Sequence, residues 1–287
     1  MFIVTGASGK LGRKIVDNLL LHVSASRIGV SVRDPGKVTA LQGRGVRVRQ
    51  ADYADAESLR YAWQGATRIL LVSSNVASTG GNPVEQHATA IAVAREVGVE
   101  RVFYTSQVSS ATKSKFPPGR DHAATEALLA QSGLNWTALR HGFYADSALM
   151  MNARAFITGE LAAPEDGKVA WTTHDDLAAA DATLLAGNIV IDGPTPPLTG
   201  CAALDLADLA QLAAEITGRS ISRTIVSDEE MMKRARVNGA PEGAIAVMLG
   251  YYRAAQAGEF ATVDHTLARL LGRPPETMKN FMRANLM

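Results

Sequence analysis

The first twelve residues of the chain place three glycines directly after a short apolar segment. Phe2–Thr5 is apolar enough to form a buried strand, and Gly6, Gly9 and Gly12 follow it at intervals of three residues. Beyond the first glycines, apolar side chains recur at helical spacing, at Leu11, Ile15, Val16, Leu19 and Leu20. A strand, a glycine turn and an amphipathic helix in direct succession are typical of the opening βα unit of a parallel α/β sheet.

The same arrangement has a chemical use. The first glycine permits the tight turn, the second lets the backbone approach a pyrophosphate, and the third lets helix and strand pack closely. The helix N-terminus presents unpaired N–H groups to the phosphates of a dinucleotide. An ordinary glycine turn is the alternative, and the βα series that follows argues against it. The predicted cofactor-binding residues of this turn are Gly6, Ser8, Gly9, Lys10, Leu11 and Gly12.

Five more apolar segments follow, and helical patterns separate them. They cover residues 27–32, 46–52, 69–72, 102–104 and 136–139. Six strands that alternate with helices predict a doubly wound parallel sheet of the Rossmann type, which is an α/β fold. Asn82-Pro83 is typical of a helix cap and first helical position, and Gly98 can end that helix.

The rhythm changes after Arg140. Further helices and strands are expected at 147–156, 169–171, 175–185, 198–199 and 205–217, with a loop rich in Pro and Gly over 192–197. We predict a dinucleotide-binding domain over residues 1–140, to which 165–200 return. Residues 141–164 and 201–287 are then expected to form a smaller, mostly helical substrate-binding region.

Composition excludes several classes of function. The chain has 29 Lys and Arg against 28 Asp and Glu, so its net charge of +1 gives no footprint for nucleic acid. Cys201 is the single cysteine, which excludes an internal disulfide, and no ligand cluster suggests a metal. No apolar stretch approaches the roughly 20 residues of a membrane span, and a strand that begins at residue 2 argues against a signal peptide. We expect a cytoplasmic monomer or homodimer that acts on a small molecule.

The residues after the second predicted strand indicate which dinucleotide is bound. NAD-binding chains usually place an acidic residue here for the ribose 2′-hydroxyl. This chain has Arg33 and, one turn later, Lys37, which can both pair with a 2′-phosphate. Two solvated surface charges are the alternative, and Asp34 could turn to a ribose instead. We predict NADP(H) in preference to NAD(H).

Polar and aromatic side chains also follow the later strands. Asp52 and Tyr53 end the third strand and are expected to flank the adenine. The residues expected near the nicotinamide half are Ser73, Ser74 and Asn75 after the fourth strand, Thr105, Ser106 and Gln107 after the fifth, and His141, Phe143 and Tyr144 after the sixth.

Several of these segments resemble one family. Val4-Thr5-Gly6-Ala7-Ser8-Gly9-Lys10-Leu11-Gly12, Val32-Arg33-Asp34-Pro35, Gln50-Ala51-Asp52-Tyr53, Tyr104-Thr105-Ser106, Asp121-His122-Ala123-Ala124-Thr125-Glu126 and Leu139-Arg140-His141-Gly142-Phe143-Tyr144 resemble the NmrA-like branch of the atypical short-chain dehydrogenases/reductases. Within the branch, the chain looks most like the type 2 quinone oxidoreductases and triphenylmethane reductases of bacteria. The resemblance implies NADP(H) binding, because members use the glycine turn and the basic residues after the second strand for that cofactor.

The resemblance also bears on catalysis. Typical short-chain dehydrogenases carry Tyr-x-x-x-Lys on the helix after the fifth strand, and the matching positions here are His122 and Glu126, on one helical face. This pair argues against ordinary alcohol dehydrogenation. Reduction of a quinone or another conjugated acceptor asks less of the protein, because hydride comes from the nicotinamide and a weak acid or water can supply the proton. His122 is a candidate general acid, although a helix-capping or packing role is the alternative.

Two functions of different classes follow. The first is an NADPH-dependent reductase of quinones or similar flat, electron-poor acceptors, with His122 and Tyr144 as its candidate catalytic residues. Gln107, Tyr144 and Trp171 are its predicted substrate contacts, and Phe143 and Tyr144 could stack on a flat substrate or simply pack in the core. The second is an NADP(H)-sensing regulator that binds a partner protein, because no strong acid–base pair is evident. The aromatic residues and the resemblance favour the reductase.

Overall fold

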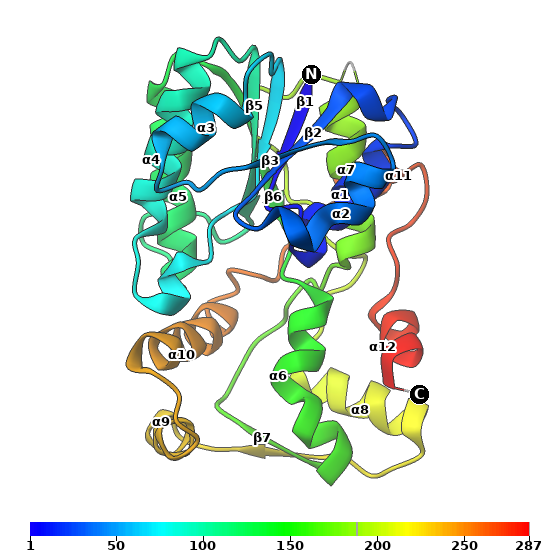
Figure 1. Cartoon of the computed structure of the whole chain (residues 1–287). Helices are drawn as coiled ribbons and strands as arrows, with labels where there is room; N and C mark the ends of the chain where they lie inside the picture. The colour runs from blue at the N-terminus through cyan, green and yellow to red at the C-terminus, as the bar shows by residue number, and fades with distance from the viewer. Residues whose placement is uncertain (188, 287) are drawn as a thin grey trace. The chain divides into compact units, whose positions relative to one another are not determined.

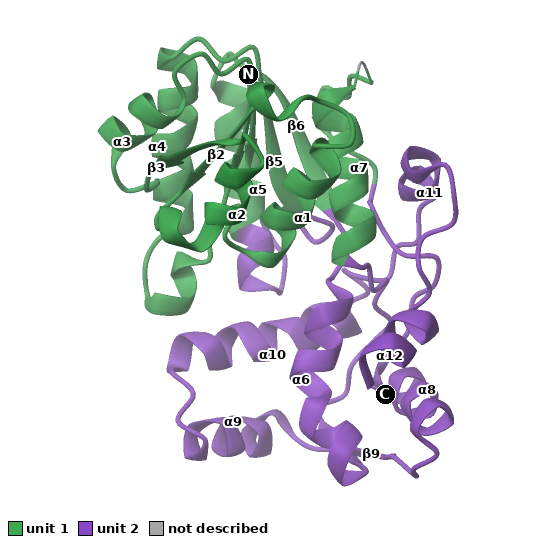
Figure 2. Cartoon of the chain, turned by 45° about the vertical axis from the view of Figure 1, so that its right-hand side comes forward, with its two compact units in different colours: residues 1–106, 121–140, 174–196 green, residues 107–120, 141–173, 197–287 purple. Residues whose placement is uncertain are grey.

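A computed structural model describes residues 1–187 and 189–286, and these divide into two compact units (Figure 2). Unit 1 contains residues 1–106, 121–140 and 174–196, and unit 2 contains residues 107–120, 141–173 and 197–287. The division differs from the predicted one, because 107–120, 165–173 and 197–200 belong to unit 2. Asn188 and Met287, which fall in the predicted ranges, lie outside the described residues.

Unit 1 is built on a sheet of seven strands in the order β3-β2-β1-β4-β5-β6-β8. The strands are β1 Phe2–Thr5, β2 Ile28–Val32, β3 Arg47–Gln50, β4 Arg68–Leu71, β5 Arg101–Gln107, β6 Asn135–His141 and β8 Gly193–Pro194. The registered pairs are parallel, with Val4 opposite Val30 on one side and Leu70 on the other. The order reverses between β1 and β4, which confirms the predicted doubly wound Rossmann-type sheet.

Helices cover both faces of this sheet (Figure 1). They are α1 Lys10–Leu19 and α7 His174–Ala186 on one face, α3 Ala56–Ala62, α4 Pro83–Glu96 and α5 Pro117–Gln131 on the other, and the short α2 Thr39–Gly43 after β2. Asp55 caps α3 and Asn82 caps α4, each through backbone N–H groups of the first turn, and the Asn82 cap is the one predicted above. Gly98 has a φ of +74° after α4, as expected of a residue that ends a helix.

The core between the sheet and its α3–α4 face is apolar and fully enclosed. Trp63, Ile69 and Ile91 are among its buried members. The indole N–H of Trp63 donates to Ser31 Oγ at 3.1 Å, so this buried polar atom is satisfied. Burial on both faces explains why the central strands appear in the sequence as continuous apolar runs.

Unit 2 is mostly helical and has a small parallel sheet of its own, formed by β7 and β9. Its elements are α6 Ala145–Thr158, β7 Glu160–Ala163, α8 Leu206–Thr217, β9 Ser222–Ile225, α9 Asp228–Val237, α10 Glu242–Gln256, α11 Thr266–Leu271 and α12 Met278–Leu286. The predicted helix over 205–217 is present as α8, with Asp205 as its N-cap.

Two predictions about elements after residue 140 are wrong. Residues 169–171 form no strand, because Val169 makes only an isolated bridge to Leu204. The seventh strand, β8, lies within the predicted loop. The predicted return of 198–199 to the sheet holds at one residue, because Leu198 forms a parallel bridge to His141 of β6. A two-residue strand with a proline at the sheet edge leaves no apolar period in the sequence.

Candidate functional site

The glycine turn after β1 has a geometry that only glycine permits. Gly6 has a φ of +61°, and its carbonyl accepts a hydrogen bond from the Gly9 N–H at 2.9 Å. A Cβ on Gly12 would lie 2.5 Å from the Gly6 oxygen and 2.8 Å from its carbonyl carbon, so α1 can pack this closely only without a side chain there. Gly9 caps α1 without a side-chain hydrogen bond, and no acid stands in the first turn. The turn is therefore a backbone cradle that suits an anion.

Two cations follow β2 at the same edge of the sheet. Arg33 and Lys37 are exposed, and neither forms an ion pair with another residue of the described ranges. Asp34 lies between them, and its Oδ1 accepts the Gly36 N–H at 3.0 Å as the cap of the short 3₁₀ turn Pro35–Val38. This carboxylate is engaged by its own turn, which weakens the alternative in which it binds a ribose.

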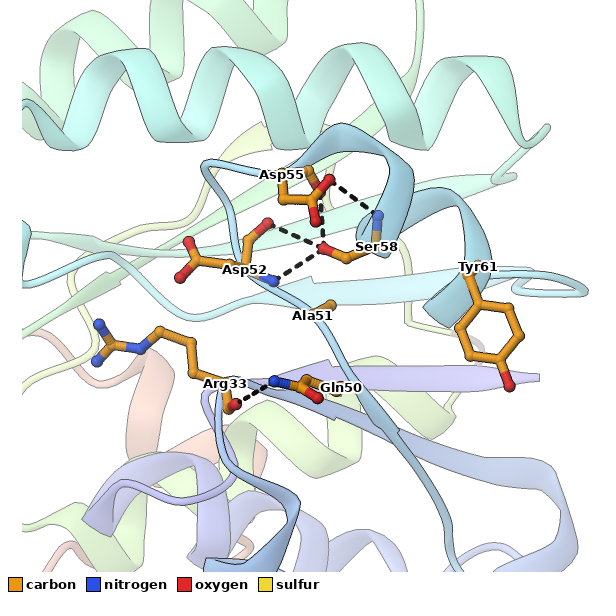
Figure 3. Close-up of a pocket in the computed structure, with 7 residues that line it drawn as sticks. All are labelled: Arg33, Gln50, Ala51, Asp52, Asp55, Ser58 and Tyr61. Carbon is orange, nitrogen blue, oxygen red and sulfur yellow. Dashed lines mark hydrogen bonds between the residues drawn. The ribbon is translucent and has the colours of Figure 1, made fainter.

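A pocket of about 440 Å³ adjoins Arg33, beyond the ends of β2 and β3 (Figure 3). Its lining consists of Arg33, Gln50, Ala51, Asp52, Asp55, Ser58 and Tyr61. The Arg33 and Asp52 side chains extend to the same side in Figure 3, and Tyr61 lies at the opposite end. Sequence reasoning missed Tyr61, whose ring lies under the Arg49 guanidinium at 4.3 Å from the ring centroid. No periodic signal marks this tyrosine, because it is an exposed residue near the end of α3.

Tyr53, which is predicted to flank the adenine, is bonded to the ends of two strands. It does not line this pocket, because its hydroxyl donates to the Val72 carbonyl at 2.9 Å and is hydrogen-bonded to the Thr5 hydroxyl. Burial raises the pKa of Tyr53, so the phenol stays protonated at neutral pH. Tyr53 ties the ends of β1 and β4 together, and Asp52 is the residue of this pair that faces the pocket.

The polar residues after β4 and β5 hold one another. The Ser73 N–H donates to Thr105 Oγ1 at 2.8 Å, and Ser74 Oγ donates to Gln86 Oε1 at 2.6 Å. Thr105 and Ser106 are buried, so their hydroxyls hold the strand ends rather than facing solvent. Ser73 Oγ accepts a long hydrogen bond from the Tyr104 hydroxyl at 3.4 Å, and Asn75 is exposed. These two side chains are therefore held less firmly than the others.

Glu126, which is predicted from the sequence to match the lysine of Tyr-x-x-x-Lys, is held by two other side chains. Its two oxygens accept from Arg140 Nε at 3.1 Å and Arg140 Nη2 at 2.7 Å, and Ser106 Oγ donates to Oε1 at 2.6 Å. The Glu126 side chain is 9% exposed. A bidentate pair in this setting joins β5, α5 and β6.

His122 lies one helical turn before Glu126 and pairs with a tyrosine of β5. Its Nδ1 is 2.8 Å from the Tyr104 hydroxyl, and the two rings are 5.6 Å apart. Burial raises the pKa of Tyr104, so this phenol is protonated at neutral pH and serves as a hydrogen-bond partner rather than as a base. His122 itself is half-buried, and Tyr104 is a residue that the sequence reasoning did not single out.

The remaining predicted residues belong to unit 2. Phe143 packs against Phe116, Trp171, Tyr251 and Phe260 with ring centroids 5.0–5.7 Å apart. Trp171 is 3% exposed, and its indole N–H donates to the Leu204 carbonyl at 3.0 Å, so it is a core residue of unit 2. His141 is also buried, while Gln107 and Tyr144 are half-buried.

No helix in the described residues is both long enough and apolar enough to cross a membrane. Within the same ranges, no group of three or more His, Cys, Asp or Glu side chains could hold a metal ion.

The sheet order, the glycine turn and the unpaired cations after β2 define a Rossmann-type dinucleotide-binding protein. The chain belongs to the NAD(P)H-binding family, whose sequence profile matches residues 6–186. Quinone oxidoreductase 2 of Escherichia coli K12 is 34% identical over 281 residues, covering 97% of this chain and 96% of that protein. This likeness confirms the resemblance to the NmrA-like branch of atypical short-chain dehydrogenases/reductases.

Solved structures agree with this assignment. The Escherichia coli NADPH-dependent quinone oxidoreductase, in complex with NADPH, has a TM-score of 0.93 and 31% identity, with both chains covered completely. The Citrobacter triphenylmethane reductase, in complex with NADP(H), has a TM-score of 0.90 and 29% identity, with 99% of each chain covered.

Proposed function

We propose that the chain is an NADPH-dependent reductase that transfers hydride to a quinone or a similar flat, electron-poor small molecule. The observation that carries this proposal is the pair of exposed, unpaired cations, Arg33 and Lys37, beside a glycine turn that accepts no side chain at Gly12. Two relatives named as an NADPH-dependent quinone oxidoreductase and a triphenylmethane reductase support it.

Each part of the site then has a role. The N–H groups of the glycine turn and of the α1 N-terminus hold the pyrophosphate. Arg33 and Lys37 neutralise the 2′-phosphate, and the pocket beside Asp52 takes the adenosine. Ser73 and Asn75 follow β4, the strand next to β1, and contact the nicotinamide half.

The chemistry fits a site without a Tyr-x-x-x-Lys pair. A bound NADPH supplies the hydride, so the protein needs only to orient the two reactants and deliver a proton. Glu126 is committed to Arg140 and Ser106, which leaves His122 as the proton donor to the oxyanion that hydride addition creates. Tyr104, 2.8 Å from His122 Nδ1, fixes the orientation of that imidazole. Gln107 and Tyr144 stay predicted substrate contacts, and we expect a cytoplasmic monomer or homodimer.

A turnover assay tests this function directly. Purified protein is given NADPH and a panel of quinones, triphenylmethane dyes and conjugated enones, and oxidation of the nicotinamide is followed by its absorbance, with NADH in parallel. We expect turnover of at least one acceptor, with NADPH preferred. Tight NADPH binding without turnover of any acceptor would contradict the reductase and favour the regulatory alternative.

A further inference from the structure

A directed chain of hydrogen bonds lies behind the end of β4, inside unit 1. The Ser74 N–H meets His87 Nε2 at 2.9 Å, and His87 Nδ1 is 2.9 Å from Thr125 Oγ1. The Thr125 hydroxyl then donates to the Asp121 carbonyl, one turn earlier in α5, at 2.9 Å. The chain links the residues after β4 to α4 and α5.

The direction of every bond follows from its first donor. A backbone N–H can only donate, so His87 Nε2 must be unprotonated where it meets Ser74. A neutral imidazole then carries its proton on Nδ1, which donates to Thr125. Thr125 has one hydroxyl proton, and this proton goes to Asp121. Each donor is used once, so the neutral Nδ1–H tautomer is the form of His87 that satisfies the whole chain.

The surroundings of His87 favour this neutral form. The side chain is 1% exposed, and its ring packs edge-on against Tyr53 at 6.1 Å and Tyr104 at 5.2 Å between centroids. Burial lowers the pKa of His87 to about 4. The two phenols that flank it keep their protons at neutral pH, because burial raises their pKa values.

Ser74 is therefore held by α4 at two atoms. His87 takes its backbone N–H, and Gln86 accepts from its hydroxyl at 2.6 Å. The same hydroxyl oxygen accepts the Val76 N–H at 3.2 Å, which starts the 3₁₀ turn Val76–Thr79. The path of the backbone through residues 73–75 depends on these contacts.

We propose that His87 is a positioning residue for the nicotinamide half of the cofactor, because it fixes the backbone of the turn that follows β4. This inference rests on the proposed function, which assigns that turn to the nicotinamide. His87 contacts neither cofactor nor acceptor in this view, and it acts through Ser74. The sequence shows only a histidine on the α4 helix, with nothing to distinguish it from a core residue.

Two substitutions separate the two hydrogen bonds of His87. In His87→Gln, the amide reaches the position of Nε2 and its oxygen can still accept from Ser74. In His87→Asn, the shorter amide reaches only the position of Nδ1, so the Thr125 contact can persist while the Ser74 contact is lost. Both variants remove the ring from the same core, so their loss of packing is similar.

Calorimetry with two ligands then locates the effect. NADPH contains both halves of the cofactor, whereas adenosine 2′,5′-bisphosphate contains only the half assigned to Arg33 and Lys37. We expect His87→Asn to raise the Kd for NADPH about tenfold, because the variant loses the hydrogen bond that holds the Ser74 backbone. The Kd for the bisphosphate is expected to stay unchanged, because that ligand lacks the nicotinamide half. His87→Gln is expected to stay within about threefold of the unsubstituted protein for both ligands.

The outcomes distinguish this proposal from the function beneath it. Equal NADPH affinity in the Asn and Gln variants, or parallel loss of the bisphosphate, would overturn the positioning role while wild-type turnover with NADPH still supported the reductase. Failure of the unsubstituted protein to bind NADPH or to oxidise it would instead overturn the proposed function, whatever the variants do.

Discussion

The edge of the unit 1 sheet at which the parallel strands end has two parts, the residues after β2 and those after β4 and β5, and these are built in opposite ways. After β2, Arg33 and Lys37 are exposed and make no ion pair with any described residue. After β4 and β5, most of the polar residues are buried or half-buried and are bonded to other side chains, as in the Ser74–His87–Thr125 chain and the Ser106–Glu126–Arg140 group. The residues after β2 therefore carry unpaired charge, whereas those after β4 and β5 are held in fixed positions by hydrogen bonds.

This difference suggests a division of labour. A phosphate carries charge and tolerates small displacements, so flexible exposed cations suffice to recognise it. Hydride transfer depends on placing a carbon atom accurately, so the groups around it have to be held by other bonds. A substitution can therefore affect the residues after β2, those after β4 and β5, or the glycine turn that serves both.

The largest effect is expected from Gly12→Ala, because the glycine turn serves both ends. The new Cβ would lie 2.5 Å from the Gly6 oxygen, so α1 must move away from the pyrophosphate. We expect NADPH and adenosine 2′,5′-bisphosphate to lose about 100-fold in affinity alike. Gly43→Ala is the matched control, since a Cβ there meets nothing within 4 Å. Unchanged binding in Gly12→Ala would show that the turn is not the cradle.

Arg140→Ala disrupts the bonded group after β5, because it leaves the buried Glu126 carboxylate without its cation. The expected loss is about 3 kcal/mol in the free energy of unfolding, measured by chemical denaturation. Adding Glu126→Gln to this variant removes the stranded charge and is expected to recover part of the loss. A double variant less stable than Arg140→Ala would show that Glu126 stabilises the fold without Arg140, for example through Ser106, and would contradict the idea of a stranded charge.

A fall in pH tests the residues after β4 and β5 through the protonation of His87. Its pKa is about 4 in the folded protein against 6.5 ordinarily, so below pH 6.5 the unfolded chain binds a proton that the folded protein does not. Stability therefore falls as the pH is lowered from 6.5 towards 4, by about 3 kcal/mol. Chemical denaturation across this range measures the slope.

The slope should be reduced in His87→Gln and retained in His22→Gln, because His22 is an exposed histidine of the same unit. Identical slopes in all three proteins would place the acid sensitivity elsewhere.

Arg33→Ala is expected to have the smallest effect, because Lys37 still faces the same phosphate. We predict about tenfold weaker binding of NADPH and no change for NADH, measured by calorimetry at low salt. Arg95→Ala, which removes an exposed arginine from α4, is the control. Equal losses for NADPH and NADH would contradict the assignment of Arg33 to the 2′-phosphate.

Local signals located much of the first unit. The glycine spacing, the Asp55 and Asn82 caps and the apolar strands each depend on neighbours within a few residues, so they can be found in one sequence. Other features depend on partners far along the chain, and they were missed or misplaced. These are the β8 strand, the bridge of Val169 and the small sheet of β7 and β9.

The same distinction applies to single side chains. The sequence placed Tyr53 beside the adenine and Trp171 at the substrate, because each follows an apolar stretch near a strand end. The fold instead uses the Tyr53 hydroxyl to join β1 and β4, and it encloses Trp171 in the core of unit 2. Which way an aromatic side chain turns is decided by the space and the acceptors that other segments leave for it.

Spacing and charge along the sequence suffice to predict the class of fold, the glycine turn and the two cations that we propose pair with a 2′-phosphate, because these are properties of adjacent residues. The tertiary structure was needed to show that Glu126 is bound to Arg140 and that His87 holds Ser74. These contacts join residues up to 14 positions apart in the chain. A hydrogen bond requires a donor and an acceptor at bonding distance, and for His87 and Glu126 folding alone creates that distance.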